Sequence, residues 1–489
     1  MAAQGLMARK SVADIMSSGE AEGHRLSKTL GPFSIIAMGI GAIIGAGIFV
    51  LTGTAAARYA GPAIMLSFVL GGIVCSFVGL CYAELAAMLP VCGSTYTYTY
   101  ATLGELVAWI IGWDLILEYA MGAATVAVGW SGYMTSLLHN LGVSIPPALA
   151  AAPGTAIKLP DGSTVTGILN LPAAVIVAIL TTMLIMGTKE SARLNNVMVA
   201  IKLVVVLAFI ALGARYVNPA NWHPFIPDNT GTFGSFGLSG VLRGSSVVFF
   251  AFIGFDAVST SAQEAKLPQR DMPIGILGSL VVCTVLYLAV AAVLTGLVPY
   301  AQLNVADPIA KGVNVIGLNW FSVLIKIGAL TGLTTVILVL LYGQSRILYT
   351  IADDGLLPGL FARLHPRLQT PYLSQMLIGL IVAVTAALVP IDVLGELVSI
   401  GTLFAFVLVC GAVIYLRRSA SETFRPFSVP GVPVVPVLGI LFCLLLMAGL
   451  PLMTWLRLVV WLAIGMVIYL SYGRTHSRLR GRPATAPLT

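Results

Sequence analysis

The sequence predicts an all-α integral membrane protein with about twelve transmembrane helices. Hydrophobic residues make up 58% of the 489 positions and charged residues only 9%, against roughly 25% in soluble domains. Apolar stretches such as 171–186, 203–212 and 438–450 recur from about residue 33 to residue 473. These stretches are too long and too uniformly apolar for barrel strands, so we expect helices, which satisfy their own backbone groups in lipid.

Glycine and proline mark several expected helix ends, including Gly61-Pro62, Pro299 and Pro390. The expected spans are 33–58, 62–89, 105–138, 171–187, 193–216, 238–263, 273–297, 318–352, 372–389, 393–417, 433–450 and 451–473. They form a first five-helix unit (33–216), a second (238–417) and two further helices (433–473), flanked by polar tails (1–32 and 474–489). The mixed charge of the first tail argues against a cleavable signal peptide.

The distribution of lysine and arginine predicts the orientation. Most of them lie in the tails and in loops on one side of the expected helices, while the other side keeps Arg58, Lys158, Arg215 and Lys311. By the positive-inside rule both tails are cytoplasmic, which requires an even number of crossings of the cell (plasma or inner) membrane. The net charge of +7 is spread over loops, so nucleic acid is not an expected partner. The loop 138–170 is expected to be a poorly structured connector.

Two expected helices contain signs of unwound backbone. The first carries Gly41, Gly45 and Gly47; small residues four apart usually pack helices closely, but the third glycine also frees the backbone to leave helical geometry. Exposed amides there would bind an anion such as a carboxylate. The sixth carries Gly254 and an acid within 249–256. Interruptions at corresponding positions of two five-helix units predict an inverted-repeat transporter that holds its substrate between them.

Several ionisable residues lie deep in the expected helices, where each charge costs at least ~2.5 kcal/mol. Lys202 and Asp256 have two possible roles. The structural role is an ion pair or a hydrogen-bond anchor. The functional role is a coupling site in which the lysine gains and loses a proton. Glu118 follows Asp114 by four positions on one helical face and would attract an amino group; otherwise it is a buried glutamate bonded only to helix ends. Glu84 is expected to be structural.

The six cysteines show no CxxC spacing and are expected to pack as small hydrophobes, so neither a disulfide framework nor a metal site is predicted. No cofactor is expected. An intramembrane enzyme is disfavoured because neither HExxH nor GxSxG occurs. A channel is disfavoured because no repeated filter or ring of like groups is apparent.

Four motifs resemble the amino acid–polyamine–organocation (APC) superfamily: GAIIGAGIF (41–49), CYAEL (81–85), GWDLILEY (112–119) and FFAFIGFD (249–256). The resemblance covers residues 25–475 and is to the bacterial cationic amino acid transporter (CAT) branch. It implies a LeuT-like fold of two inverted five-helix repeats plus two additional helices, with helices 1 and 6 broken mid-membrane.

The resemblance also implies a site. The substrate carboxylate would bind the backbone amides of Ile43, Gly45, Ala46 and Gly47. The substrate α-amino group would bind the carbonyls of Phe250, Ala251 and Ile253. Glu118 would contact the substrate through water. Phe250 would also be an aromatic gate. Lys202 would occupy the cation site of sodium-coupled relatives, which favours protons, and Asp256 would assist coupling.

Two positions depart from the family pattern. Ala46 replaces a hydroxyl residue that many members carry, so one contact to the carboxylate is missing. Lys326, within the eighth expected helix, either snorkels to the nearby interface or faces the vestibule, where it would favour neutral substrates.

The sequence therefore predicts a secondary active transporter of cationic or small neutral L-amino acids, working as a proton-coupled symporter by alternating access. The alternative is an amino acid or polyamine exchanger or facilitator without proton coupling. The expected partners are an L-amino acid, protons, the lipid bilayer and a small accessory membrane protein.

Overall fold

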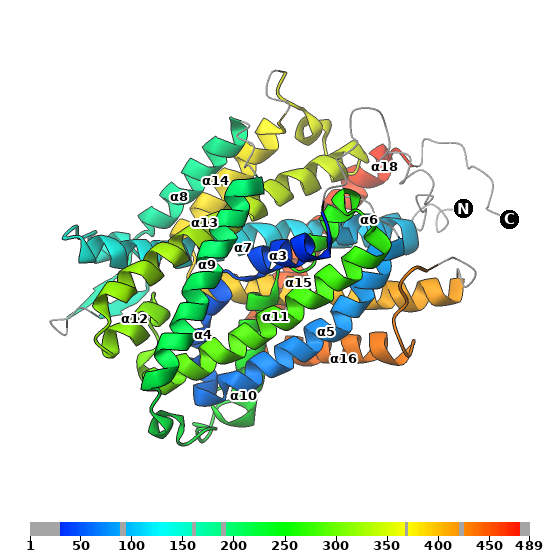
Figure 1. Cartoon of the computed structure of the whole chain (residues 1–489). Helices are drawn as coiled ribbons and strands as arrows, with labels where there is room; N and C mark the ends of the chain where they lie inside the picture. The colour runs from blue at the N-terminus through cyan, green and yellow to red at the C-terminus, as the bar shows by residue number, and fades with distance from the viewer. Residues whose placement is uncertain are drawn as a thin grey trace.

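The computed structural model describes residues 30–88, 94–158, 163–186, 192–366, 370–419 and 425–479, and it is mostly helical (Figure 1). The α-helices are α3 (Pro32–Ile43), α4 (Thr52–Ala55), α5 (Ile64–Met88), α6 (Ser94–Thr102), α7 (Glu105–Asn140), α8 (Leu171–Ile185), α9 (Ala192–Gly213), α10 (Gly237–Val248), α11 (Pro268–Leu297), α12 (Pro308–Val315), α13 (Asn319–Asp353), α14 (Tyr372–Leu388), α15 (Ile391–Ser419), α16 (Val434–Ala448), α17 (Leu452–Ile468) and α18 (Arg474–His476). Short 3-10 and π turns are η1 (Gly47–Leu51), η2 (Ala56–Ala60), η3 (Gly61–Ala63), η4 (Pro147–Leu149), η5 (Ala214–Tyr216), η6 (Pro219–Trp222), η7 (Phe249–Phe252), η8 (Ala257–Glu264), η9 (Tyr300–Gln302), η10 (Gly359–Ala362) and η11 (Tyr469–Gly473).

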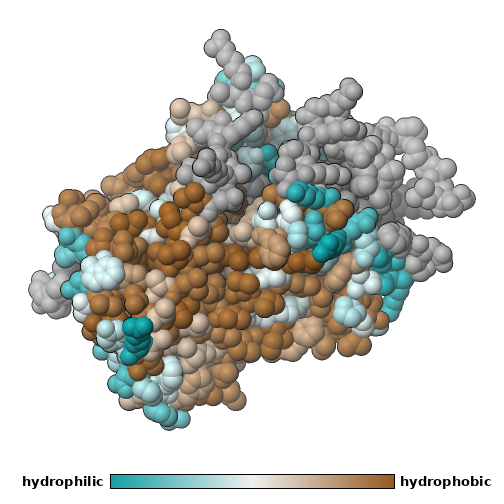
Figure 2. All heavy atoms as spheres, in the orientation of Figure 1, coloured by the Kyte–Doolittle hydropathy of each residue, from teal (hydrophilic) through white to brown (hydrophobic). Residues whose placement is uncertain are grey.

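The helices suit a lipid environment. Among the described residues, 7 helical stretches are long and apolar enough to cross a membrane: Gly47–Met88, Glu105–Asn140, Val197–Tyr216, Pro268–Leu297, Asn319–Asp353, Ile391–Ser419 and Leu452–His476. Shorter apolar helices are Pro32–Ile43, Leu171–Ile185, Gly237–Phe252, Tyr372–Leu388 and Val434–Ala448. Figure 2 shows hydrophobic side chains over the middle of the surface and hydrophilic ones toward both ends. The chain is thus an all-α membrane protein, and the number of about twelve crossings stays a prediction.

Long helices pack side by side to form the interior. In Figure 1, α5 runs beside α11 and α8 beside α14, and α7 and α13 pack together along their lengths. Tryptophans attach α17 to α7: Trp113 donates its indole N–H to the Trp461 carbonyl at 2.8 Å, and Trp461 donates back to the Trp113 carbonyl at 3.0 Å. Their rings stack at 4.6 Å. These contacts hold the last helices against the core.

Helical hydrogen bonding is interrupted at two of the places where the sequence predicts unwound backbone. We call residues 44–46 the first interruption: α3 ends at Ile43, and Ile44 is extended with ψ 101° before the π turn η1 begins at Gly47. We call residues 253–256 the second interruption: η7 ends at Phe252, and Ile253 is extended with ψ 140°. Gly254 has φ +111°, a conformation that L side chains rarely adopt. Both places coincide with the glycines noted in the sequence.

The loop 138–170 differs from the expected unstructured connector. Its described part contains η4 and a small antiparallel sheet in which β1 (Ala156–Lys158) pairs with β2 (Thr164–Thr166), with Ile157 opposite Val165. The β-branched residues in both strands favour this pairing. The described part of the loop therefore contains some regular structure, where the sequence predicted none.

Glu84 has the structural role expected of it. Its carboxylate, 1% exposed, accepts two hydrogen bonds from the Arg417 guanidinium at 3.0 and 2.7 Å and one from the Val429 amide at 2.7 Å. Arg425 lies 3.4 Å away. The two-pronged pairing ties α5 to the end of α15 and the segment that follows it.

Candidate functional site

The segments that flank the two interruptions touch each other. A Cβ added to Gly47 would overlap the backbone and side chain of Ala251 in η7, so only glycine allows η1 and η7 to approach this closely. From the other side, a Cβ on Gly254 would lie 2.8 Å from the Ala42 carbonyl oxygen near the end of α3. The glycines that mark the interruptions therefore also allow direct backbone packing between them.

A tyrosine from a third helix lies between the two interruptions. The Tyr287 hydroxyl of α11 is 2.7 Å from the Ala251 carbonyl and 2.9 Å from the Ile43 carbonyl, within hydrogen-bond distance of both. Tyr287 is 1% exposed, and its ring contacts Phe68 and Phe252. Because buried carbonyls without donors are costly, this hydroxyl stabilises the geometry of both interruptions.

We expect Tyr287→Phe to lower the affinity for the transported solute about tenfold, since an unsatisfied buried carbonyl costs about 1–3 kcal/mol and the carbonyls would lose their alignment. The ring contacts stay, so the protein should fold. Tyr133→Phe is the matched control, because its buried hydroxyl donates to the Phe49 carbonyl at 2.8 Å away from the contact between the interruptions. Calorimetric binding to both purified variants measures the effect. Equal affinity losses in the two would contradict a specific role for Tyr287.

Lys202 of α9 also contacts the first interruption. Its ammonium donates to the carbonyl of Gly41 and, at 3.1 Å, to that of Ile44, and the residue is fully buried. Among the described residues, no carboxylate forms an ion pair with Lys202. Its structural role is therefore that of a hydrogen-bond anchor and not that of an ion-pair partner of Asp256. A lysine ammonium that donates to carbonyls freed at a helix end replaces the missing helical donors.

Buried carboxylates gather beside the second interruption. Glu118 and Asp114 of α7, 2% and 0% exposed, both face α15: Asp114 lies against Gly401 and Glu118 beside Thr402. Asp256 is 2% exposed, close enough to Glu118 to interact electrostatically, and accepts a 3.2 Å hydrogen bond from the Gly254 amide. Like charges this deep disfavour one another, so such a group is suited to a proton or a cationic amine.

Every predicted substrate-binding residue except the half-buried Ile253 is buried. Four of the eight are glycine or alanine, so their backbone amides and carbonyls are the groups available to a solute. A surface hollow of about 770 Å³ lies elsewhere, lined by Ile36, Arg270 and Phe427 among others. Within the described ranges, no three His, Cys, Asp or Glu side chains are placed to hold a metal ion.

Lys326 is buried and pairs with an acid. Its side chain is 2% exposed, its ammonium lies 3.8 Å from the Asp307 carboxylate, and it donates to the Ser136 carbonyl at 3.4 Å. Burial raises the pKa of Asp307, opposed by a hydrogen bond from the Ser136 hydroxyl and by Lys326. The lysine joins α13 to α7 and to the residue that precedes α12, and its position at the outer interface or toward a vestibule stays a prediction.

The raised pKa of Asp307 predicts a pH-dependent effect on stability. The folded state disfavours the ionised carboxyl, so the contribution of Asp307 to stability is greatest below its unfolded pKa of about 4 and falls as pH rises through the folded pKa. Wild type and Asp307→Asn should therefore melt together at acid pH, and wild type should lose stability relative to the variant as pH rises. Melting temperatures in detergent across pH test this; a constant difference would contradict it.

Sequence reasoning missed two residues around the site: Tyr287 and Thr402. A phenol hydroxyl within a mostly apolar span was an available signal for Tyr287, because such a group needs a partner in lipid. Thr402 has ordinary surroundings in the sequence. Its role depends on which helix lies opposite.

The chain is similar to known proteins over most of its length. A family model described as amino acid permease matches residues 30–473. The chain is 50% identical to the branched-chain amino acid permease BcaP of Bacillus subtilis (strain 168), covering 96% of this chain and 98% of that one. It is 46% identical to the methylthioribose transporter of the same organism, covering 94% and 97%. It is 37% identical to cationic amino acid transporter 9, chloroplastic, of Arabidopsis thaliana, covering 93% and 89%.

Proposed function

Because the chain belongs to the amino acid permease family of the APC superfamily, it is a membrane-embedded amino acid transporter and not an enzyme, and we propose that it is a proton-coupled symporter working by alternating access. Its substrates are cationic or small neutral L-amino acids. The observation that carries the proposal is the contact of Gly47 with Ala251, together with the Tyr287 hydroxyl, which lies within hydrogen-bond distance of the Ile43 and Ala251 carbonyls. Two segments that leave helical geometry thus lie beside one another, and their backbone amides and carbonyls would suit the two charges of a zwitterion.

In this proposal the substrate carboxylate binds the backbone amides at positions 43 and 45–47, at the positive end of the helix that continues through η1. The α-amino group binds carbonyls at 250, 251 and 253. Glu118 supplies the negative charge nearest the substrate amine or side chain. The burial of these groups supports alternating access, because neither side of the membrane reaches them without movement.

The coupling step is assigned to Lys202 and Asp256. While Lys202 is charged, its ammonium donates to the Gly41 and Ile44 carbonyls and so holds the first interruption. Loss of the proton removes a donor and weakens that hold, which would link protonation to the movement of α3. The alternative, exchange or facilitated transport without proton coupling, needs no change at Lys202.

The relatives bear on substrate choice. One that is 50% identical and another that is 35% identical are both named branched-chain amino acid permeases, and others are named cationic amino acid transporters. Ala46 offers no hydroxyl to the carboxylate, while Glu118 would favour a cationic side chain. Branched-chain and cationic amino acids are therefore the first compounds to test.

We further propose that the helices and the termini are arranged as the sequence predicts. Units 33–216 and 238–417 form inverted repeats whose first helices are discontinuous at residues 44–46 and 253–256, and 433–473 adds two helices. The termini (1–32 and 474–489) lie in the cytoplasm, so Arg58 and Asp307 lie on the outer face.

A thermal-shift screen of purified protein against the twenty amino acids, common polyamines and methylthioribose tests the substrate class. A shift from methylthioribose alone would overturn the proposed substrates. Uptake of the best ligand into proteoliposomes should then accelerate under an inward proton gradient and not under a sodium gradient. Acceleration by sodium alone would contradict the role of Lys202, and counterflow without any effect of a proton gradient would favour the exchanger.

A further inference from the structure

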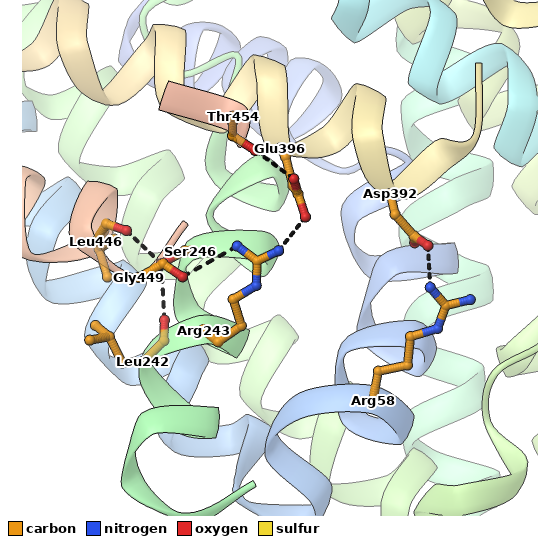
Figure 3. A network of polar contacts seen from close by, with 9 residues as sticks. All are labelled: Arg58, Leu242, Arg243, Ser246, Asp392, Glu396, Leu446, Gly449 and Thr454. Atoms are coloured by element: carbon orange, nitrogen blue, oxygen red, sulfur yellow. Dashed lines mark hydrogen bonds and ion pairs between the residues drawn. The ribbon is translucent and has the colours of Figure 1, made fainter. Parts of the chain in front are cut away.

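Helix α15 carries two carboxylates on one face, Asp392 and Glu396, four residues apart. Each pairs with an arginine from a segment next to an interruption: Arg58 of η2 pairs with Asp392, and Arg243 of α10 pairs with Glu396 (Figure 3). The residues that pair lie 334 and 153 positions apart in the chain. One helix therefore binds a segment adjoining each interruption.

The two segments form one packing unit, which we call the arm pair: residues 47–60 and α10. The Phe236 amide donates to the Tyr59 carbonyl at 2.8 Å, and the Arg243 guanidinium lies over the Tyr59 ring at 5.2 Å. A Cβ on Gly244 would lie 3.1 Å from the Ala60 side chain, so the backbones approach closely. A movement of one arm is thus expected to carry the other with it.

The two ion pairs differ in environment. The Arg243 and Glu396 side chains are 8% and 10% exposed, and Glu396 also accepts a hydrogen bond from Thr454 of α17 at 2.7 Å. Arg243 donates a second hydrogen bond to the Gly449 carbonyl at 3.2 Å. The Arg58 and Asp392 side chains are 43% and 26% exposed. A buried pair resists separation far more than an exposed one, which water and salt screen.

The arm pair is also attached to α16, at a contact nearer the second interruption. Ser246, one helical turn beyond Arg243, donates to the Leu446 carbonyl of α16 at 2.6 Å. Figure 3 shows this contact to the left of the arginine–glutamate pair in the same network. If α10 tilts about this contact, its first residues near Gly237 travel further than Arg243, which lies close to the contact.

We propose that Asp392 and Glu396 are positioning residues that form a two-point latch: they hold the arm pair against α15 and so close the Arg58 face of the protein. Glu396 is the stronger point because it is buried and has Thr454 as a second partner. Opening this face breaks both pairs, and water entering the gap hydrates the four charges. The Thr454 hydroxyl then remains bound to Glu396 and keeps it oriented for reclosure.

Spin-label distances test the latch without any substrate. Nitroxide labels at Ala57 and Leu452 report the arm pair against α17, and labels at Ala57 and Leu238 report distances inside the arm pair. Glu396→Gln should broaden the Ala57–Leu452 distribution toward longer distances and leave the Ala57–Leu238 distribution narrow. Asp392→Asn, at a partly exposed site that tolerates replacement, should act in the same direction with a smaller amplitude.

Asp353→Asn is the matched control, because Asp353 pairs with Arg478 in another exposed ion pair, 2.8 Å long, outside the latch. It should change neither distribution. The latch is overturned if neither Glu396→Gln nor Asp392→Asn lengthens the Ala57–Leu452 distance. It is also overturned if the Ala57–Leu238 distance broadens equally, since that would show general loosening.

A transport readout separates positioning from mere stability, and this part alone rests on the proposed function. With the Arg58 face more often open, Glu396→Gln should lower the half-saturation concentration of L-isoleucine or L-arginine offered from that face and lower the maximal rate severalfold. A simple loss of folded protein would lower the rate at unchanged half-saturation, and that result would contradict the positioning role. If neither amino acid is transported, the proposed function fails, while the distance measurements still decide on the latch.

Discussion

Replacing Glu118 by glutamine is expected to weaken substrate binding at least about tenfold, and up to complete loss, without disturbing expression. The carboxylate is buried beside Asp256 and Thr402, close to the second interruption. Hydrogen bonds to charged groups contribute about 1.5–3 kcal/mol, and 1.4 kcal/mol corresponds to a factor of ten in affinity. Glutamine keeps the shape but lacks the charge that attracts an amine. Calorimetric titration of the purified variant with the best ligand measures the loss.

Glu105→Gln provides the control on the same helix. Glu105 is also fully buried, but it accepts a 2.8 Å hydrogen bond from Tyr469 and one from Tyr100 at 3.1 Å, far from the interruptions in the chain. This variant should lose thermal stability and keep its affinity. Unchanged affinity in folded Glu118→Gln would remove Glu118 from the site.

The second large effect is expected from Gly47→Ala. The added methyl group would overlap the backbone of Ala251, which cannot move aside as a flexible side chain can. The two interruptions must separate, and overpacking of this kind costs about 1–3 kcal/mol. We expect transport to fall more than about tenfold, since each 1.36 kcal/mol changes a rate tenfold, together with a lower melting temperature.

Gly395→Ala is the matched replacement. Its Cβ would lie 3.4 Å from the Leu51 side chain, an ordinary van der Waals contact with the same arm. It should leave transport and melting temperature close to wild type. Full transport by Gly47→Ala in proteoliposomes would show that the two interruptions need not touch, and the proposed site would then be wrong.

Much of the architecture could be predicted because lipid imposes strong constraints. Apolar runs must be helices in a bilayer, so the helical class followed from composition alone, and the motifs identified the family. The lengths of individual spans were harder. α11 begins at Pro268, five positions before the predicted start at Pro273, because proline at a helix start is favourable and the polar residues after it still form the first turn.

The part of the site that consists of backbone amides and carbonyls could be predicted from the sequence. Glycine has a local meaning, so Gly45, Gly47 and Gly254 indicated where helical bonding could stop. Lys202 could be singled out because a charge in lipid is costly and such residues are rare. Its partners, the Gly41 and Ile44 carbonyls, could not be predicted from the neighbouring residues in the sequence. The partner of Lys326 could not be read from its neighbours either, since Asp307 belongs to a connecting segment.

The amino-acid sequence by itself determined that this protein lies in lipid, that it is helical, which family it belongs to, and at which glycines helical hydrogen bonding stops. Each of these depends on composition or on residues within a few positions of one another. Only the tertiary structure decided which groups meet there: Tyr287 with Ile43, 244 positions away, and Arg243 with Glu396, 153 positions away. Such pairs depend on which helices lie side by side, and no local pattern encodes the neighbour that a buried polar group will find.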